Sequence, residues 1–241
     1  MKKQYRSAIF IIALFTLVGI TSSSVSAQQS DKEKAKQVKK AAETAKNASK
    51  VLNELMKIPA NSIPTKLLKD ARAIAVFPKV IKAAFGIGGA GGQGLISRRV
   101  KGGWSAPVAF KIASGSVGFQ IGASSTDYVM LFMSDDSLKN LLEDKFEMGA
   151  EGSVAAGPVG RTAAATTNAQ LEAEILTYSR AKGLFAGISL KGGLLSPDND
   201  RNQALYGKNS KELLTGTNKI AIADIPTATK GFQETVTAYA K

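Results

Sequence analysis

The stretch FGIGGAGGQGLISRRVKGGWSAP, Phe85–Pro107, holds eight glycines, a pair of arginines and the single tryptophan of the chain. Glycine adopts backbone angles that other residues avoid and is costly to order, so this density indicates a specific role. Two interpretations compete: a loop whose backbone approaches a phosphate, or a close-packed β turn where larger side chains do not fit. The residues around the stretch distinguish them.

The glycines match a dinucleotide-binding pattern in letters only. Gly86, Gly88 and Gly91 satisfy G-x-G-x-x-G, which must also open a helix and meet an acidic residue about 20 positions on. The residues that follow are strand-like, and no Asp or Glu occurs between Asp70 and Asp127. No glycine is followed by Lys-Ser or Lys-Thr, so a P-loop is missing too. We therefore expect a close-packed turn in a β framework and no cofactor.

The remaining pattern predicts an α+β fold: a glycine-rich, mainly antiparallel β-sheet core, barrel or sandwich-like, with an N-terminal amphipathic helix, short helices and a C-terminal helix. Apolar runs separated by Ser, Gly and Asp predict strands at Ala73–Val80, Gly94–Val100, Val108–Ile112, Val117–Gly122, Tyr128–Met133, Glu147–Ala156, Gly160–Ala165, Ala173–Ser179 and Gly183–Lys191. The three runs between Val108 and Met133 are expected to form a meander.

Capping signals place the short helices. Pro64 near a first turn predicts one helix, and Ser134 as N-cap predicts another at Asp135–Asp144. An apolar face predicts a helix at Thr227–Ala240. The polar segment PDNDRN, Pro197–Asn202, is expected to be an exposed turn. Trp104 is either a core residue, the commoner case, or an interfacial anchor.

The first residues predict a secretory signal peptide. Basic residues precede an apolar run, Ala8–Ile20, and small residues end the segment at Ala27. The run is short for a membrane-spanning helix, which needs roughly 20 residues; an uncleaved anchor is the alternative. We expect residues 1–27 to be removed and residues 28–241 to form a single domain. The mature charge would then be +10, since the lost segment holds three basic and no acidic residues.

Composition narrows the function. The chain has no Cys and no His, which excludes disulfides, Cys/His zinc sites and His-based triads. Ser179–Lys182 spells S-x-x-K, but its supporting motifs are absent. Of two close carboxylate pairs, Asp135/Asp136 begins a helix, where acids suit the dipole, and Asp198/Asp200 lacks the further ligands of a calcium loop. We therefore expect no enzyme and no metal site. A net charge of +13 points to anionic partners, and export of a basic, cysteine-free chain suggests a bacterial periplasm or cell envelope.

The first mature helix carries the sharpest pattern. Asp31–Lys57 has strong helix formers without Gly or Pro, and Ser30 with Glu33 fits a capping box at its start. At about 100° per residue, one set of lysines falls within about 80°. The set is Lys32, Lys36, Lys39, Lys46, Lys50 and Lys57, opposite a side of Ala, Val, Leu and Met. Such a helix can lie on an anionic membrane, or pack its apolar side on a domain and leave its lysines in water.

Four strings along the chain resemble the SYLF domain family, also called the yeast Ysc-type actin-binding domain. They are Gly103–Pro107 (GWSAP), Gly118–Gly122 (GFQIG), Val154–Arg161 (VAAGPVGR) and Tyr178–Leu190 (YSRAKGLFAGISL). The resemblance covers roughly Lys32 to Tyr239 and implies a lipid-binding module: eukaryotic members bind phosphoinositides, with the N-terminal amphipathic helix implicated, and yeast members bind actin. The chain lacks the SH3 or FYVE module of many eukaryotic members, and an envelope offers neither actin nor typical phosphoinositides. What the resemblance transfers is affinity for anionic lipid headgroups.

These observations give two hypotheses. In the first, anionic phospholipid is bound by basic residues of the helix and of the glycine-rich stretch: Lys32, Lys36, Lys39, Lys46, Lys50, Arg98, Arg99 and Lys101. In the second, the chain is a scaffolding protein whose lysines meet an acidic protein partner. Nucleic acid is not expected, because export and the lack of interleaved aromatic residues oppose it.

Overall fold

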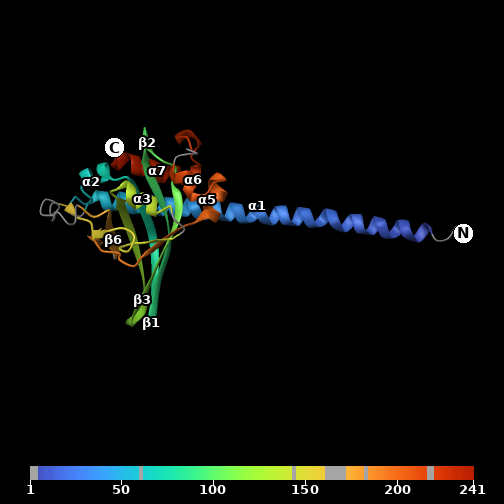
Figure 1. The fold of residues 1–241 in the computed structure, drawn as a ribbon, viewed down its shortest axis with the longest axis horizontal. Helices are drawn as coiled ribbons and strands as arrows, with labels where there is room; N and C mark the ends of the chain where they lie inside the picture. Colours follow the sequence, from blue (N-terminus) through green and yellow to red (C-terminus); the bar gives the residue numbers. More distant parts are fainter. Residues whose placement is uncertain (1–4, 60–61, 143–144, 161–171, 182–183, 216–219) are drawn as a thin grey trace.

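The computed structural model describes residues 5–59, 62–142, 145–160, 172–181, 184–215 and 220–241, with side chains described from Ser30 onward except at 84–87 and 116–121. A curled sheet is crossed by one long helix, whose N-terminal part projects away from the body (Figure 1). The fold class predicted from sequence, α+β with a mainly antiparallel sheet, is confirmed.

The helices are α1 (Tyr5–Lys57), α2 (Thr65–Asp70), α3 (Asp135–Asn140), α5 (Asn199–Tyr206), α6 (Ser210–Thr215), the 3₁₀ turn η2 (Ile222–Asp224) and α7 (Thr227–Tyr239). Local signals predicted several of them correctly: Pro64 directly precedes α2, and the Ser134 hydroxyl accepts a hydrogen bond from the Ser137 N–H at the start of α3. The expected capping box is wrong. α1 runs through Ser30 without a break, and Glu33 instead accepts hydrogen bonds from Lys36 and Gln37.

The strands are β1 (Ala73–Val100), β2 (Gly103–Trp104), β3 (Val108–Phe132), β4 (Phe146–Glu147), β5 (Val154–Ala156), β6 (Ile175–Ala181), β7 (Leu184–Gly187) and β8 (Leu194–Pro197). The prediction of separate strands around a glycine turn, followed by a three-stranded meander, is wrong. β1 and β3 are continuous and pair with each other from Ala73↔Phe132 to Ile96↔Val108, with register shifts near Phe77–Val80 and Phe85–Ile87. The expected strand at Gly160–Ala165 lies outside the described residues after Gly160.

The paired strands β1 and β3, here called the ribbon, run together out of the body (Figure 1). The Arg99 N–H donates to the Arg72 carbonyl, so the two ends of β1 lie side by side. The ribbon therefore doubles back between them, in the part of β1 that contains the second register shift. Gly94 lies where these halves of β1 touch: a Cβ there would stand 2.5 Å from the Val76 carbonyl oxygen. The sequence was therefore right that glycine marks a close β contact, although that contact is between halves of one strand.

Other strands extend both flanks of the ribbon. β6 pairs with the end of β3 at Asp127–Phe132, and β8 pairs with its beginning at Phe110–Ala113. β5 pairs parallel to β6, and β7 and β4 complete the edges. The curled sheet has a core on each side. One core contains the buried side of α1, Trp104 and Phe232 of α7, and the other contains Phe77, Phe110, Phe146 and Leu213 of α6. Trp104 is thus a core residue, 1% exposed.

Candidate anion-binding site

The lysines predicted on α1 all lie on its exposed side. Its opposite side is buried against α7 and the sheet through Ala41, Ala45, Ala48, Val51, Leu52 and Leu55. The helix therefore uses its apolar residues to build the core, as the packed-helix interpretation expected. Lys36 pairs with Glu33 at 3.2 Å and Lys50 with Glu54 at 3.8 Å. Within the described residues, Lys32, Lys39 and Lys46 are exposed and form no ion pair.

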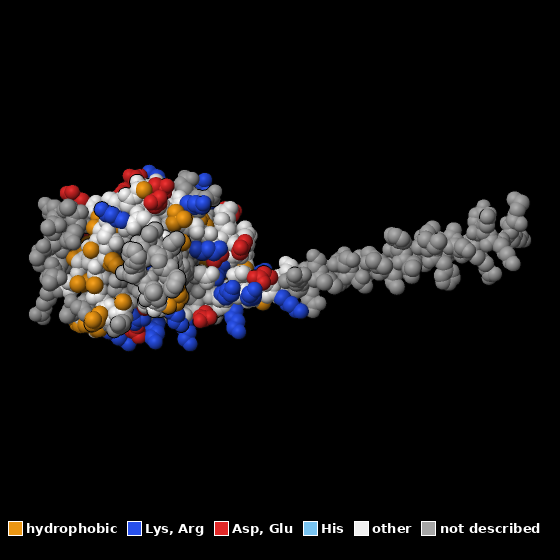
Figure 2. Space-filling model, turned by 90° about the horizontal axis from the view of Figure 1, so that it is seen from below, with side chains coloured by type: hydrophobic (Ala, Val, Ile, Leu, Met, Phe, Trp, Pro, Cys, Tyr) orange, Lys and Arg blue, Asp and Glu red, His pale blue; other side chains and the backbone are white. Residues whose placement is uncertain are grey.

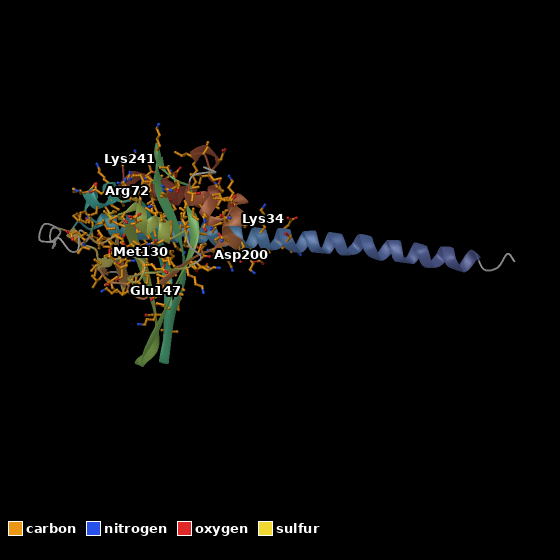
Figure 3. The ribbon with its side chains drawn as sticks, in the orientation of Figure 1. Lys34, Arg72, Met130, Glu147, Asp200 and Lys241 are labelled. Atoms are coloured by element: carbon orange, nitrogen blue, oxygen red, sulfur yellow. The ribbon has the colours of Figure 1, made fainter. Side chains whose placement is uncertain are left out.

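Basic side chains are prominent where α1 leaves the body (Figure 2). Lys34 and Asp200 lie beside each other there (Figure 3), and both line a shallow pocket with Glu33 and Gln37. The C-terminal end of α1 is held to the sheet by ion pairs. Arg180 of β6 joins the Glu54 carboxylate to that of Asp127 on β3, with Arg180 Nη2 2.6 Å from Asp127 Oδ2. Burial raises the pKa of the Asp127 carboxyl, and a hydrogen bond from the Lys79 N–H opposes this rise.

The predicted pair Arg98 and Arg99 is largely occupied within the fold. Arg99 donates to the carbonyls of Ala71 at 3.0 Å, Leu68 at 3.1 Å and Ala240 at 3.0 Å, and its guanidinium lies 4.5 Å from the centre of the Trp104 ring. Its bonds tie together the ends of α2 and α7, and burial lowers its pKa. Arg98 donates through its side chain to the Leu214 carbonyl. Lys101 is exposed in the turn that follows β1.

These three residues line one pocket of about 430 Å³ together with Arg72, Asp135 and Thr215. Sequence reasoning missed Arg72, which precedes β1 and reaches the pocket only because β1 doubles back. None of the predicted lysines of α1 lines this pocket. The structure thus places the predicted residues in two basic regions.

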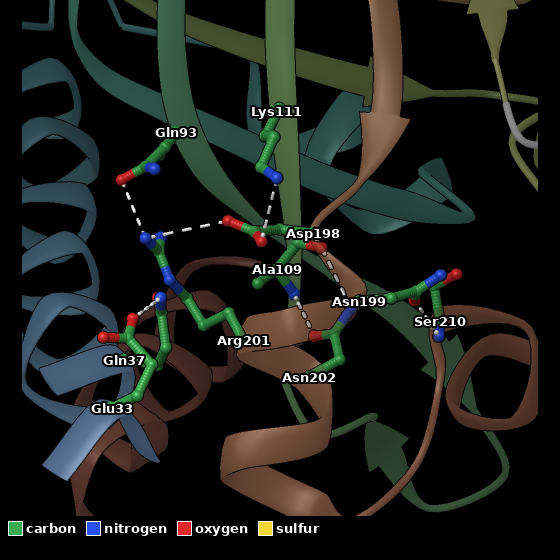
Figure 4. Close-up of polar contacts among 10 residues, drawn as sticks. All are labelled: Glu33, Gln37, Gln93, Ala109, Lys111, Asp198, Asn199, Arg201, Asn202 and Ser210. Atoms are coloured by element: carbon green, nitrogen blue, oxygen red, sulfur yellow. Dashed lines mark hydrogen bonds and ion pairs between the residues drawn. The ribbon is translucent and has the colours of Figure 1, made fainter. Parts of the chain in front are cut away.

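A polar network around α5 was also missed, because PDNDRN was expected to be an exposed turn. α5 begins inside that segment, and Asp198, Arg201 and Asn202 are buried. The Asn202 side chain accepts from the Ala109 N–H at 2.8 Å and donates to its carbonyl at 3.1 Å, completing the edge of β3 (Figure 4). The helical spacing of Asp198, Arg201 and Asn202 is the signal that could have indicated a shared buried face.

A groove of about 730 Å³ lies between α1 and the ribbon. Its α1 wall consists of Lys40, Glu43, Thr44 and Asn47, and its other walls include Lys79, Gly92, Gln93 and Lys111. Lys40 fell outside the predicted stripe, and Lys79 and Lys111 stand on strands where no pattern singled them out. Among the described residues, no group of acidic residues could hold a metal ion, and no helix has a segment long and apolar enough to cross a membrane.

Comparison with known proteins identifies relatives of this structure. The family model described as "Ysc84: Las17-binding protein actin regulator" matches residues 113–239. Protein YSC84 of Saccharomyces cerevisiae is 36% identical over 192 residues, which cover 75% of this chain and 41% of the relative. LAS seventeen-binding protein 3 of the same species is 38% identical over 160 residues, covering 64% and 35%. SH3 domain-containing YSC84-like protein 1 of Mus musculus is 35% identical over 169 residues, covering 67% and 49%. The chain spans less than half the length of each.

Proposed function

We propose a function for this chain, which belongs to the Ysc84 (SYLF) family. It binds the anionic headgroups of membrane phospholipids through the exposed lysines of α1 and catalyses no reaction. The family description names a binding protein and actin regulator, and one relative is called LAS seventeen-binding protein 3. The observation that carries the proposal is the division of α1 into a buried apolar side and an exposed side on which Lys32, Lys39 and Lys46 have no ion-pair partner among the described residues.

The division of α1 also determines the mode of binding. Since its Ala, Val and Leu side chains are buried in the core, insertion of this face into lipid would require the helix to leave the sheet. Contact through the lysines alone needs no such change. Each basic residue near an anionic surface contributes about 1 kcal/mol, and this attraction weakens as salt rises. We propose that the exported chain acts in this way at the cell envelope, after cleavage near Ala27.

Vesicle co-sedimentation tests the proposal with residues 28–241, the product of the expected cleavage. Phosphatidylglycerol vesicles should retain the protein, phosphatidylcholine vesicles should not, and salt should reduce retention. The variant with Lys36→Glu, Lys39→Glu and Lys46→Glu should bind at least about tenfold more weakly. The control changes three exposed lysines elsewhere, Lys69, Lys191 and Lys230, to Glu and so has the same net charge. Equal losses in both variants, or equal binding to both kinds of vesicle, would contradict a site on α1.

The alternative is a scaffold in which the same lysines bind an acidic protein face. It is favoured by the name of one yeast relative, LAS seventeen-binding protein 3. Crosslinking in intact cells separates the alternatives, since a scaffold predicts a protein adduct that the Lys36/Lys39/Lys46 variant loses. Recovery of lipid adducts alone would count against the scaffold.

A further inference from the structure

The groove between α1 and the ribbon has an excess of positive charge. Lys40, Lys79 and Lys111 line it, and Glu43 is the acidic residue among its lining residues. Lys111 is paired with Asp198 at 3.2 Å. Lys40 and Lys79 form no ion pair within the described part of the chain, although both are exposed. The groove therefore presents ammonium groups from a helix and from both strands of the ribbon.

A buried arginine adjoins the groove. Arg201 is 1% exposed, and its Nη2 donates to Gln93 Oε1 at 2.8 Å and lies 3.6 Å from Asp198 Oδ2. Gln93 and Lys111 also line the groove, and their polar ends converge with those of Asp198 and Arg201 (Figure 4). Arg201 Nε and Nη1 have no hydrogen-bond partner among the described groups. Burial lowers the pKa of Arg201, and the Asp198 charge opposes this shift.

The backbone fixes Lys79 at the edge of the groove. Lys79 has φ 53°, a left-handed conformation that residues with a Cβ rarely adopt. Its N–H donates to Asp127 Oδ1 at 2.8 Å, and the register of β1 and β3 shifts at this point. The shift and the hydrogen bond hold Lys79 in this conformation, opposite the α1 wall that carries Lys40.

We infer that this groove is a binding site for a phosphate group, held by Lys40, Lys79 and Lys111, with the buried guanidinium of Arg201 behind it, bonded to the lining residue Gln93. Three lysines and one carboxylate, that of Glu43, line the groove, so its lining carries a positive charge that an added anion would balance. Phosphate has several charged oxygens and can accept from several donors at once, which suits ammonium groups arriving from separate walls. The site is separate from the predicted lysines of α1 and does not depend on the proposed function.

Calorimetric titration of the full chain with inorganic phosphate tests the inference, against sodium chloride at equal ionic strength. We expect phosphate to bind and chloride to give no comparable heat. Lys40→Gln with Lys79→Gln should weaken phosphate binding about tenfold, which is the loss of two exposed charge contacts of roughly 0.7 kcal/mol each. Both residues are exposed and leave the Lys111–Asp198 pair intact. Lys46→Gln with Lys50→Gln, on α1 but outside the groove lining, should change the affinity less than about twofold. The inference is overturned if phosphate does not bind or if both double variants bind it equally.

A second arm identifies the source of the phosphate. Vesicles of phosphatidylcholine with phosphatidic acid present the group as a headgroup. If the Lys40/Lys79 variant loses both phosphate binding and vesicle retention, and free phosphate competes with the vesicles, the site takes a lipid headgroup. If it loses phosphate binding and retains the vesicles, the site takes a free phosphate-bearing solute. The Lys36/Lys39/Lys46 variant is compared in the same assays. If it loses vesicle binding and keeps its affinity for phosphate, the result supports the groove site and assigns the vesicle contact to α1. Retention of vesicles by that variant would contradict the proposed function alone.

Discussion

Two sets of basic residues are predicted from the sequence to bind anionic lipid, and the lysines of α1 and Arg99 behave in opposite ways in the fold. The lysines of α1 extend into solvent, and Lys32, Lys39 and Lys46 have no ion-pair partner among the described residues. Arg99, at the end of β1, donates to three backbone carbonyls and stacks on Trp104. The first set is available to a ligand, and Arg99 serves mainly to hold α2, α7 and the ribbon together.

The difference follows from the chemistry of the two side chains. A guanidinium is planar and weakly hydrated, with donors in a fixed arrangement, so it can satisfy the last carbonyls of two helices at once. A lysine ammonium is strongly hydrated and favours solvent unless it is paired. A sequence-level count of charge treats both as equal contributions to a basic surface. Such a count overestimates the cations that a ligand can reach, because it includes Arg99, whose donors are already hydrogen-bonded within the fold.

The largest loss of stability is expected for Arg99→Ala. The change removes three hydrogen bonds to carbonyls at the ends of α2 and α7 and the contact with the Trp104 ring. We expect the free energy of unfolding to fall by about 3 kcal/mol, since hydrogen bonds to charged groups contribute about 1.5–3 kcal/mol each and partial exposure reduces the total. Urea denaturation measures it. Lys101→Ala, in the exposed turn nearby, is the control and should change stability by less than about 0.5 kcal/mol. Similar losses of stability in the two variants would show that the contacts of Arg99 do not stabilise the fold.

An intermediate effect is expected for Arg180→Ala, because Arg180 links α1 to the sheet through Glu54 and Asp127. We expect a loss of about 2 kcal/mol at neutral pH, below the cost of breaking a fully buried ion pair. Burial raises the pKa of Asp127, so its folded-state carboxyl binds a proton more tightly than the unfolded chain does. Without the Arg180 charge this pKa should rise further. Lowering the pH therefore favours folding of the variant more than folding of the parent, and the deficit of the variant should shrink as the pH falls from 7 toward about 4. A deficit that grows over this range would contradict this account of Asp127.

Local signals in the sequence were sufficient for the class of the fold and for the starts of α2 and α3. Ser134 caps α3, and the apolar spacing of α7 places Phe232 and Val236 in the core. The ribbon was not predictable in this way, because glycine interrupts strand patterns while pairing with β3 keeps β1 continuous. Arg201 was missed for a related reason. A polar hexapeptide favours an exposed turn, and only the packing of α5 against β3 shows that its Asn202 side chain hydrogen-bonds the backbone of Ala109.

The candidate sites were predictable only in part, and for a physical reason. The lysines of α1 follow one helical period, so sequence alone could align them. The groove combines Lys40, Lys79 and Lys111, which are separated along the chain and meet because the ribbon doubles back beneath α1. No local period relates such residues. Their grouping depends on long-range contacts, which a single sequence does not reveal.

The smallest effect on stability is expected for Lys46→Gln, and it tests the other side of the comparison. Lys46 is exposed on α1 and forms no ion pair among the described residues, so its removal leaves no buried group unsatisfied. We expect the free energy of unfolding to change by less than about 0.5 kcal/mol, as is usual for such surface positions. If the lysine contacts a membrane, retention by phosphatidylglycerol vesicles should fall up to about fivefold, equivalent to roughly 1 kcal/mol per basic residue. Urea denaturation and co-sedimentation of the same preparation measure the two effects. A loss of stability comparable to that of Arg99→Ala would show that this lysine, too, is held within the fold.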